Sequence, residues 1–310
     1  MKILVTGGAG FIASHVVDEY IRIGHDVVVV DNLSTGYEKN INKKAKFYQM
    51  DICSKDIEKI FEIEKPDIVN HHAAQISVPL SCKNPLIDAE INAKGFINIL
   101  ENCVKQEVKQ VIFISSGGAV YGEATTYPTP ETYDPKPLSP YAIHKYLSEM
   151  YLHYYHEAFG LKYTTLRYAN VYGPRQVSHG EAGVVSIFIE KYLANEIPYL
   201  FAYPEQKDGM IRDYVYVKDV VKANVTALKE PIQQAINIGT QIETSTGTLL
   251  REIAKQMNKE CKFIADEPRP GDIKRSCLII EKAKNMLQWT PEYTLATGIA
   301  ETIEYFKNIK

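Results

Sequence analysis

The amino-acid sequence predicts an α/β protein with a doubly wound parallel sheet and a smaller, loop-rich C-terminal lobe. Short β-branched apolar runs alternate with segments of helical periodicity through the first half of the 310 residues. A glycine-rich turn joins the first apolar run to the first helical segment, as in a Rossmann-type sheet. From Gly173 to Gly209, glycines and prolines interrupt this pattern, which indicates a lobe laid over the sheet edge.

The first half supplies most of the predicted sheet. Its apolar runs lack alternating polar residues, as expected for strands that are buried on both faces. Gly24 is placed to end the first helix. We expect strands at residues 2–6, 26–30, 47–50, 68–70 and 111–115, and helices at 11–23, 57–64 and 89–105.

The second half opens with a long helix predicted from Tyr141 to Phe159. Ser139 suits its N-cap, Pro140 its first position and Gly160 its end. We expect further strands at residues 161–167, 213–217 and 235–238, and helices at 248–257, 280–287 and 295–306.

Composition excludes several classes of protein. The formal net charge is −3 and no long basic run is present, so a nucleic-acid partner is not expected. The aliphatic runs are too short to span a bilayer, and no charged segment followed by an apolar stretch resembles a signal peptide. The five cysteines are scattered without zinc-like spacing, which predicts reduced thiols in a cytoplasmic protein, with no metal site.

The glycine-rich turn predicts a dinucleotide site. Gly7 and Gly10 allow a tight turn that approaches a pyrophosphate, Ala13 takes the third small position, and the following helix begins at the phosphates. Asp31 ends the second strand about 20 residues later, where a carboxylate binds the ribose hydroxyls and repels a 2′-phosphate. The predicted cofactor is therefore NAD rather than NADP.

Two polar segments extend this site. Asn32, Ser34 and Gly36 form a turn suited to the adenosine ribose. Asp51 follows the third strand and either reaches the adenine amine or caps a helix that begins at Ile52. Both interpretations of Asp51 fit the sequence.

Tyr141 and Lys145 are the candidate proton-transfer pair. Residues four apart on a helix share one face, with Cβ atoms about 5–6 Å apart. A lysine ammonium there favours the tyrosinate, so we expect the phenol to exchange protons below its ordinary pKa of about 10. Beside a dinucleotide, the pair predicts hydride transfer at an alcohol or ketone carbon.

These residues belong to a series of motifs that continues to the end of the chain. The series comprises residues 6–12 (TGGAGFI), 31–36 (DNLSTG), 72–75 (HAAQ), 115–122 (SSGGAVYG), 139–145 (SPYAIHK), 166–175 (LRYANVYGPR), 212–214 (RDY) and 269–272 (RPGD). In this order they resemble the extended short-chain dehydrogenases/reductases, most closely the UDP-glucose 4-epimerases.

The resemblance implies the roles of further residues. Ala73, Ala74 and Asn92 would line the nicotinamide half of NAD, and Tyr168 would pack near the nicotinamide. Asn170, Arg212 and Arg269 would hold the diphosphate of a UDP-sugar, and Asp272 its uridine ribose. Guanidinium groups suit phosphate by charge and geometry, although Arg212 could instead pair with Asp219.

The predicted sites and domains are then as follows. The catalytic residues are Tyr141, Lys145 and Ser116. The cofactor residues are Gly7, Gly10, Phe11, Ile12, Asp31, Asn32, Ser34, Gly36, Asp51, Ile52, Ala73, Ala74, Asn92, Tyr141, Lys145 and Tyr168. The substrate residues are Ser116, Tyr141, Asn170, Arg212, Arg269, Asp272 and Ser276. Residues 1–170, with core elements near 211–240, would bind NAD, and residues 171–210 and 241–310 the UDP-sugar.

The chain departs from the family pattern at Gly117, where many relatives carry a catalytic Ser or Thr. We expect Ser116 to take that role, since a glycine pair permits a shifted loop. No carboxylate stands at residues 117–119, which disfavours a dehydratase or a decarboxylase. The expected reaction is the interconversion of UDP-glucose and UDP-galactose through a 4-keto sugar.

Alternatives stay open. UDP-glucuronate 4-epimerisation would need only an added cationic contact, whereas a non-catalytic NAD- or sugar-nucleotide-binding regulator would be expected to lack Tyr141 or Lys145. The small Ser276, seven residues past Arg269, predicts that N-acetylhexosamine forms are also accepted. The resemblance further implies a homodimer through the helices at residues 89–105 and 141–159.

Overall fold

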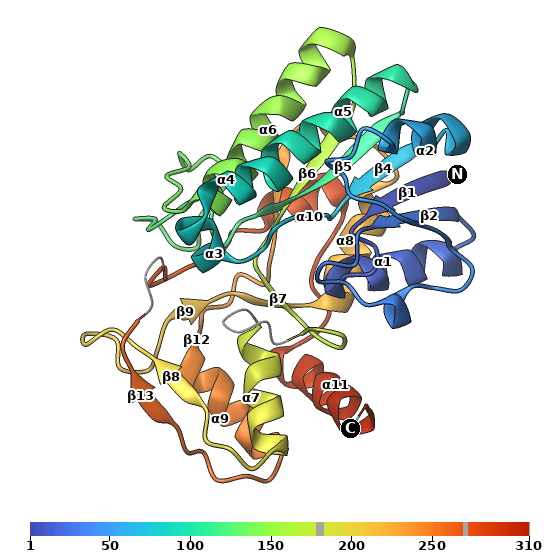
Figure 1. Ribbon diagram of the computed structural model, residues 1–310. Helices are drawn as coiled ribbons and strands as arrows, with labels where there is room; N and C mark the ends of the chain where they lie inside the picture. The colour runs from blue at the N-terminus through green and yellow to red at the C-terminus, as the bar shows by residue number, and fades with distance from the viewer. Residues whose placement is uncertain (178–182, 269–271, 310) are drawn as a thin grey trace.

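The computed structural model describes residues 1–177, 183–268 and 272–309, and a seven-stranded parallel sheet forms its centre (Figure 1). The strand order is β11-β6-β5-β4-β1-β2-β3. The sheet strands are β1 (Lys2–Thr6), β2 (Asp26–Asp31), β3 (Lys46–Gln49), β4 (Ile68–His71), β5 (Gln110–Ser116), β6 (Tyr163–Tyr168) and β11 (Ala235–Ile238). The chain moves outward from β1 to β3 and then returns to β4, so the order of the strands reverses between β1 and β4. Ligands of doubly wound sheets bind at such a point.

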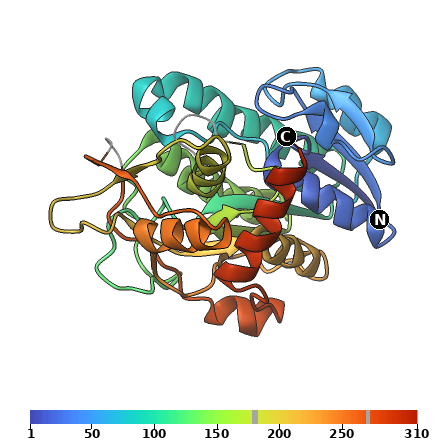
Figure 2. The same cartoon turned by 90° about the horizontal axis from the view of Figure 1, so that it is seen from below.

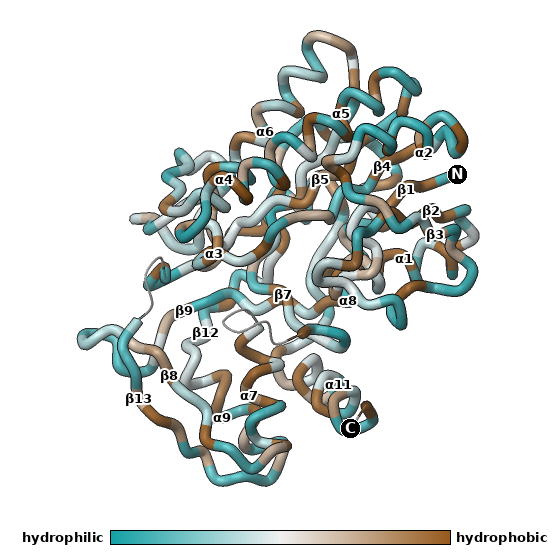
Figure 3. Tube along the Cα trace, viewed as in Figure 1, coloured by the Kyte–Doolittle hydropathy of each residue, from teal (hydrophilic) through white to brown (hydrophobic). Residues whose placement is uncertain are grey.

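Helices cover both faces of the sheet, and each face has its own apolar core. The covering helices are α1 (Phe11–Arg22), α8 (Val217–Ala227) and α10 (Glu281–Leu287) on one face, and α2 (Ile57–Glu64), α5 (Phe96–Lys105) and α6 (Pro140–Phe159) on the other. In Figure 3 the apolar colour runs along β1 where the strand passes between these layers. The strand residues Ile3, Leu4 and Val5 are fully buried.

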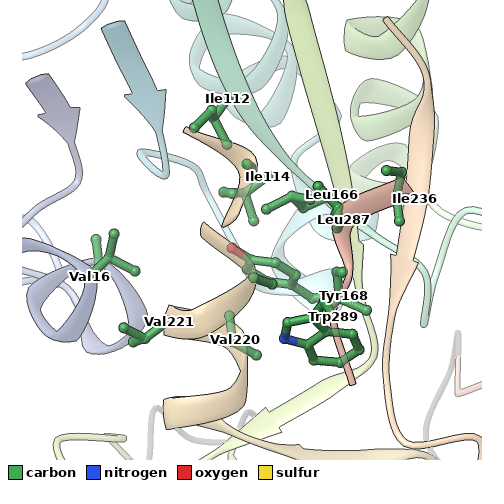
Figure 4. Packing of buried hydrophobic residues seen from close by; sticks show 14 of the residues in the cluster. Val16, Ile112, Ile114, Leu166, Tyr168, Val220, Val221, Ile236, Leu287 and Trp289 are labelled. Atoms are coloured by element: carbon green, nitrogen blue, oxygen red, sulfur yellow. The ribbon is translucent and has the colours of Figure 1, made fainter. Parts of the chain in front are cut away.

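Trp289 closes the core on the α8 face. Figure 4 shows its indole beside Tyr168, Leu287 and Val220. The indole Nε1 donates a hydrogen bond to the carbonyl oxygen of Asp219, at 2.9 Å. The chain segment that follows α10 is thereby fixed to α8.

The second lobe consists of short elements grouped below the sheet edge in Figure 1 and seen from below in Figure 2. Its helices α7 (Val184–Leu193), α9 (Thr246–Gln256) and α11 (Leu295–Asn308) share a third apolar core. Paired short strands complete it: β7 (Asn170–Tyr172) with β10 (Tyr214–Tyr216), β8 (Tyr199–Phe201) with β13 (Ile264–Asp266), and β9 (Ile211–Arg212) with β12 (Thr244–Ser245).

Most predicted elements are confirmed with small shifts at their ends. Asp31 ends β2, and Ser139 caps α6 by accepting a hydrogen bond from the backbone N–H of Ala142, at 3.3 Å. Gly160 takes the left-handed conformation that ends this helix, with φ 71°. The division of the chain into the two predicted domains stays a prediction.

Several predicted elements need correction. The strand expected at residues 213–217 ends at Tyr216, because Val217 begins α8, and α8 was not predicted. The short helices α3 (Val78–Lys83) and α4 (Pro85–Asp88), and α7 in the expected loop region, were also missed. The helix expected at residues 89–105 begins as a π-helix, η2 (Ala89–Gly95), before α5. Among the described residues, no helix is long and apolar enough to cross a bilayer.

Candidate active site

A cleft of about 750 Å³ lies at the carboxyl ends of the sheet strands, where the strand order reverses. The segments that follow β1, β2, β4 and β5 line it, together with the start of α6. Sixteen of the predicted site residues lie on its wall: Gly7, Gly10, Phe11, Ile12, Asp31, Asn32, Ser34, Asp51, Ile52, Ala73, Ala74, Ser116, Tyr141, Lys145, Tyr168 and Asn170.

The glycine turn fits a dinucleotide pyrophosphate. Gly7 has φ +70°, and a Cβ there would lie 2.7 Å from the backbone nitrogen of Ala73, so the position requires glycine. Gly10 is the N-cap of α1 and offers no side-chain acceptor to the first helical N–H groups. These groups are therefore available to an anion at the positive end of the helix. Gly36 packs against the turn, where an added Cβ would lie 2.8 Å from that of Ala9.

Asp31 is held rigidly at the end of β2. One carboxylate oxygen accepts a hydrogen bond from the N–H of Ala9 at 3.0 Å, and the other accepts from the N–H of Leu33 at 2.8 Å. Each oxygen keeps acceptor capacity for a ribose hydroxyl. A fixed negative charge beside the turn disfavours a 2′-phosphate, which supports the preference for NAD.

Asp51 belongs to the same end of the cleft. Its carboxylate accepts hydrogen bonds from the Asn32 side chain at 2.9 Å and from the N–H of Cys53 at 2.8 Å. Burial acts to raise its pKa, but these hydrogen bonds outweigh burial and lower it. The alternative of a helix cap at Asp51 is wrong, since α2 begins only at Ile57.

Tyr141, Lys145 and Ser116 meet on the cleft wall. All three line the cleft, and a hydrogen bond from Ser116 acts to lower the pKa of the Tyr141 phenol. The Lys145 ammonium donates to the carbonyl oxygen of Ile114 at 2.9 Å and lies 5.9 Å from the centre of the Tyr141 ring. One of its three donor hydrogens is thus used by β5, and two are left for other partners.

Burial dominates the electrostatics of this group. It raises the pKa of the Tyr141 phenol to about 12; the hydrogen bond to Ser116 opposes the rise and the Asp88 charge adds to it. Burial also lowers the pKa of Lys145 to about 8, against the charges of Asp88 and Glu149. The expectation that Lys145 brings the Tyr141 pKa below its ordinary value is therefore wrong, because desolvation of the phenol dominates its pKa.

The packing around Gly117 explains its departure from the family pattern. A Cβ at this position would lie 2.5 Å from Cδ1 of Leu278 and 3.2 Å from the carbonyl oxygen of Arg167. Leu278 is itself buried. The neighbouring Ser115 is engaged elsewhere, since its hydroxyl donates to Glu149 at 2.5 Å. Ser116 is therefore the serine of this loop that is placed beside Tyr141.

Fewer of the residues predicted to bind substrate lie on the cleft wall than of those predicted to bind the cofactor. Asn170 lies on the cleft wall, and a Cβ added at Gly118 would lie 3.4 Å from its Oδ1 and 4.0 Å from Oγ of Ser276. Arg212 lies on β9 and donates to the carbonyl oxygen of Ile211 at 2.9 Å. The backbone carbonyl of Asp272 accepts a hydrogen bond from the Tyr203 hydroxyl at 2.8 Å. Arg269 lies outside the described residues.

Asn92 lies behind the cleft wall rather than on it. Its side chain accepts from the N–H of Gln75 at 2.8 Å and donates to the carbonyl oxygen of Gln75 at 2.9 Å. Gln75, Ile76 and Ser77 do line the cleft, and the sequence interpretation assigned them no role. These three residues follow closely after β4, which ends at His71. Because ligands bind at the carboxyl ends of such strands, their position could have identified them as cleft residues.

Within residues 1–177, 183–268 and 272–309, no group of three or more His, Cys, Asp or Glu side chains is arranged to hold a metal ion.

Comparison with known proteins agrees with this geometry. Residues 3–239 match the model of the NAD-dependent epimerase/dehydratase family. A putative UDP-glucose 4-epimerase of Methanocaldococcus jannaschii is 46% identical over 99% of this chain and 98% of its own length.

Two solved structures are similar over the whole chain. A UDP-glucose 4-epimerase of Thermotoga maritima with UDP-glucose is 47% identical, with a TM-score of 0.96, covering 100% of this chain and 99% of that one. A Thermus thermophilus UDP-glucose 4-epimerase in complex with NAD is 41% identical, with a TM-score of 0.95 and complete coverage of both chains.

The two adjacent glycines of the catalytic loop give a matched test of this packing. We expect Gly117→Ala to lower the free energy of unfolding by about 1–3 kcal/mol, because its Cβ enters the space of Leu278. Gly118→Ala has room and should stay close to the wild-type value. Chemical denaturation followed by circular dichroism measures both, and equal stabilities of the two variants would contradict the packing argument.

Proposed function

The chain belongs to the NAD-dependent epimerase/dehydratase family, and from this premise we propose that it interconverts UDP-glucose and UDP-galactose. The reaction would invert the sugar at C4 by reversible hydride transfer through a 4-keto sugar. The observation that carries the proposal is the meeting of Tyr141, Lys145 and Ser116 on the wall of the cofactor cleft. We further propose that the enzyme works in galactose metabolism in the cytoplasm, where its five free cysteines would stay reduced.

The glycine turn, Asp31 and the Asn32–Asp51 pair would hold NAD. The bound cofactor would supply the acceptor for the C4 hydride and return the hydride to the opposite face of the sugar. Because the cofactor ends each cycle unchanged, the protein has no need to release it. Ala73, Ala74 and Tyr168 would face its nicotinamide half, and Asn92 would support that wall through Gln75.

Tyr141 is the proposed acid and base. As phenolate it would take the proton of the C4 hydroxyl, and it would return the proton after the sugar has turned. Its raised pKa makes the phenolate a minor species near neutral pH but a strong base. Lys145 would stabilise the phenolate by charge and donate a hydrogen bond to the nicotinamide ribose. Ser116 would hydrogen-bond to the same sugar oxygen.

Residues 117–119 add no acid or base beside Ser116, which favours chemistry at C4 alone. Gly117, Gly118 and Ala119 bring no carboxylate to the sugar, so the acid–base groups that elimination or decarboxylation would require are missing from this loop. Asn170, Arg212 and Arg269 are the proposed contacts of the diphosphate, and Asp272 of the uridine ribose. These anchors would keep the 4-keto sugar bound while it turns.

We also propose that two copies of the chain associate through α6 and its neighbours. Ile143, Met150 and Tyr154 lie on one face of this helix and are 48%, 56% and 55% exposed. Leu86 on the adjacent α4 is 81% exposed. An apolar stripe of this kind favours burial against a second copy.

Replacement of the phenol tests the proposed function. We expect Tyr141→Phe to reduce epimerase turnover by at least about 10²-fold, because the acid–base group is lost, while NAD still binds. Turnover is measured by coupled assay on UDP-glucose, UDP-galactose and UDP-glucuronate, and NAD binding by calorimetry. A near-normal rate in Tyr141→Phe would refute the assignment, and wild-type turnover of UDP-glucuronate alone would favour the rival epimerase.

The small side chain of Ser276 predicts which UDP-sugars the protein accepts. We expect the wild-type protein also to epimerise UDP-N-acetylglucosamine, because residue 276 is a small serine and lies near Gly118 and Asn170. Ser276→Tyr should lower this activity about 10–200-fold more than the activity on UDP-glucose, whereas Ser276→Ala should retain both. Undetectable N-acetyl turnover beside robust UDP-glucose turnover in the wild type would contradict the prediction.

The proposed dimer is tested by charge placed on α6. Wild-type protein should have twice the chain mass in size-exclusion chromatography with light scattering. Met150→Glu combined with Tyr154→Glu should give the mass of one chain, since two carboxylates cannot be buried unpaired in the interface. Ile63→Glu, at an exposed apolar site on α2, is the control and should stay dimeric. A double variant that stays dimeric would place the interface elsewhere.

A further inference from the structure

Asp88 is a fully buried carboxylate at the end of α4, immediately behind the cleft wall. One of its oxygens accepts hydrogen bonds from the side chains of Gln75, at 2.7 Å, and Asn92, at 3.0 Å. The other oxygen lies 2.5 Å from Nδ1 of His144 on α6. Three side chains from three segments of the chain therefore converge on one buried charge.

The partners of Asp88 connect it to two segments that line the cleft. Gln75 lines the cleft, and its amide nitrogen also donates to the carbonyl oxygen of Ser77, at 3.0 Å. His144 lies one residue before Lys145 and three after Tyr141. Breaking a buried pair leaves an uncompensated charge and costs several kcal/mol, so this arrangement holds the Gln75–Ser77 segment and α6 in a fixed relation.

The π-helix η2 supports the same point. It begins directly after Asp88 and contains Asn92, whose main-chain oxygen accepts a hydrogen bond from the Ser148 hydroxyl of α6, at 3.3 Å. π-helical turns are rare and occur often at functional sites. Here the irregular turn lets Asn92 hydrogen-bond to both Gln75 and Asp88.

We propose that Asp88 is a positioning residue, which ties the cleft wall at Gln75 to the catalytic helix and sets the electrostatic potential at Tyr141 and Lys145. This inference rests on the proposed roles of Tyr141 and Lys145. The charge of Asp88 raises the pKa of both groups, so it favours the ammonium and disfavours the phenolate. Removal of the charge should lower both pKa values together.

Other ionisable groups surround Asp88 and must be considered with it. Glu90 and Lys94 on η2 form an exposed ion pair, at 2.6 Å, and Lys83 on α3 is exposed, so all three are screened by solvent. Further ionisable groups of this region are His72 on the cleft wall and Tyr141, His144, Lys145 and Glu149 on α6.

Asp88→Asn tests the electrostatic role of Asp88, because it removes the charge but keeps the shape of the side chain and one acceptor oxygen. Both limbs of the pH profile of kcat/KM should move to lower pH, by about one pH unit, whichever group titrates on each limb. Asp219→Asn is the matched control: Asp219 is also buried but lies on α8, across the sheet, so its loss should leave both limbs in place. Unmoved limbs in a folded Asp88→Asn variant would overturn the proposal.

The effect of the Asp88 charge on the Tyr141 phenol can also be measured by NMR, without an activity assay. In protein labelled with ζ-¹³C tyrosine, the resonance missing from Tyr141→Phe identifies Tyr141, and its titration midpoint should fall in Asp88→Asn. If the wild type epimerises no nucleotide sugar, the proposed function fails, but this titration still tests the Asp88 charge. An unchanged midpoint would refute the electrostatic role.

Gln75→Leu tests the positioning role of Asp88. It also tests the proposal if Asp88→Asn does not fold. It removes the direct hydrogen bond from the Gln75 side chain to Asp88 but keeps the charge and the bonds of Asn92 to the Gln75 backbone. We expect the NAD dissociation constant to rise several-fold in calorimetry, with both limbs of the pH profile where the wild type has them. Wild-type NAD affinity in Gln75→Leu would show that the tie does not position the wall.

Discussion

The parallel pairing of β1 with β2 on one side and β4 on the other is the constraint on which the site depends. Its register sets Thr6 opposite both Val30 and His71, so the carboxyl ends of the three strands lie level. Each segment that leaves these strands therefore emerges at one sheet edge. The glycine turn, Asp31 and the Ala73–Gln75 segment meet there although they are far apart in the chain, and right-handed crossovers bring the helix of Tyr141 to the same edge.

Burial at this edge sets the chemistry. Tyr141 and Lys145 are surrounded largely by protein atoms, and desolvation favours the neutral form of each, which raises one pKa and lowers the other. A phenolate formed in such a place is a stronger base than a solvated one, and an ammonium there gives up its proton more readily. The fixed groups around them, Ser116, the Ile114 carbonyl and Asp88, then decide how far each pKa moves.

Short sequence patterns predicted many of the helices and strands and many of the residues that line the cleft. Asp31 followed an apolar run and a glycine turn, and Tyr141 followed a helix cap, so each position was predicted from its neighbours. The helix α8 was missed because it follows β10 without a turn, and its Val217 continues an apolar run. The raised pKa of Tyr141 and the clustering on Asp88 arise from residues on other elements, which no sequence window contains.

The C-terminal segment at residues 276–278 packs between the second lobe and the loop that follows β5. The backbone N–H of Thr129 donates to the carbonyl oxygen of Cys277 at 2.8 Å, and the backbone N–H of Ser276 donates to that of Ile211 at 3.0 Å. Residues 276–278 are thus held against both the loop and the lobe. Leu278 then fills the space that a side chain at residue 117 would need. The hydroxyl that the family pattern places at residue 117 is found here at Ser116, whose backbone is fixed by strand pairing with Tyr168. The same packing places Ser276 near Gly118, so two proposed site residues, Ser116 and Ser276, depend on one segment.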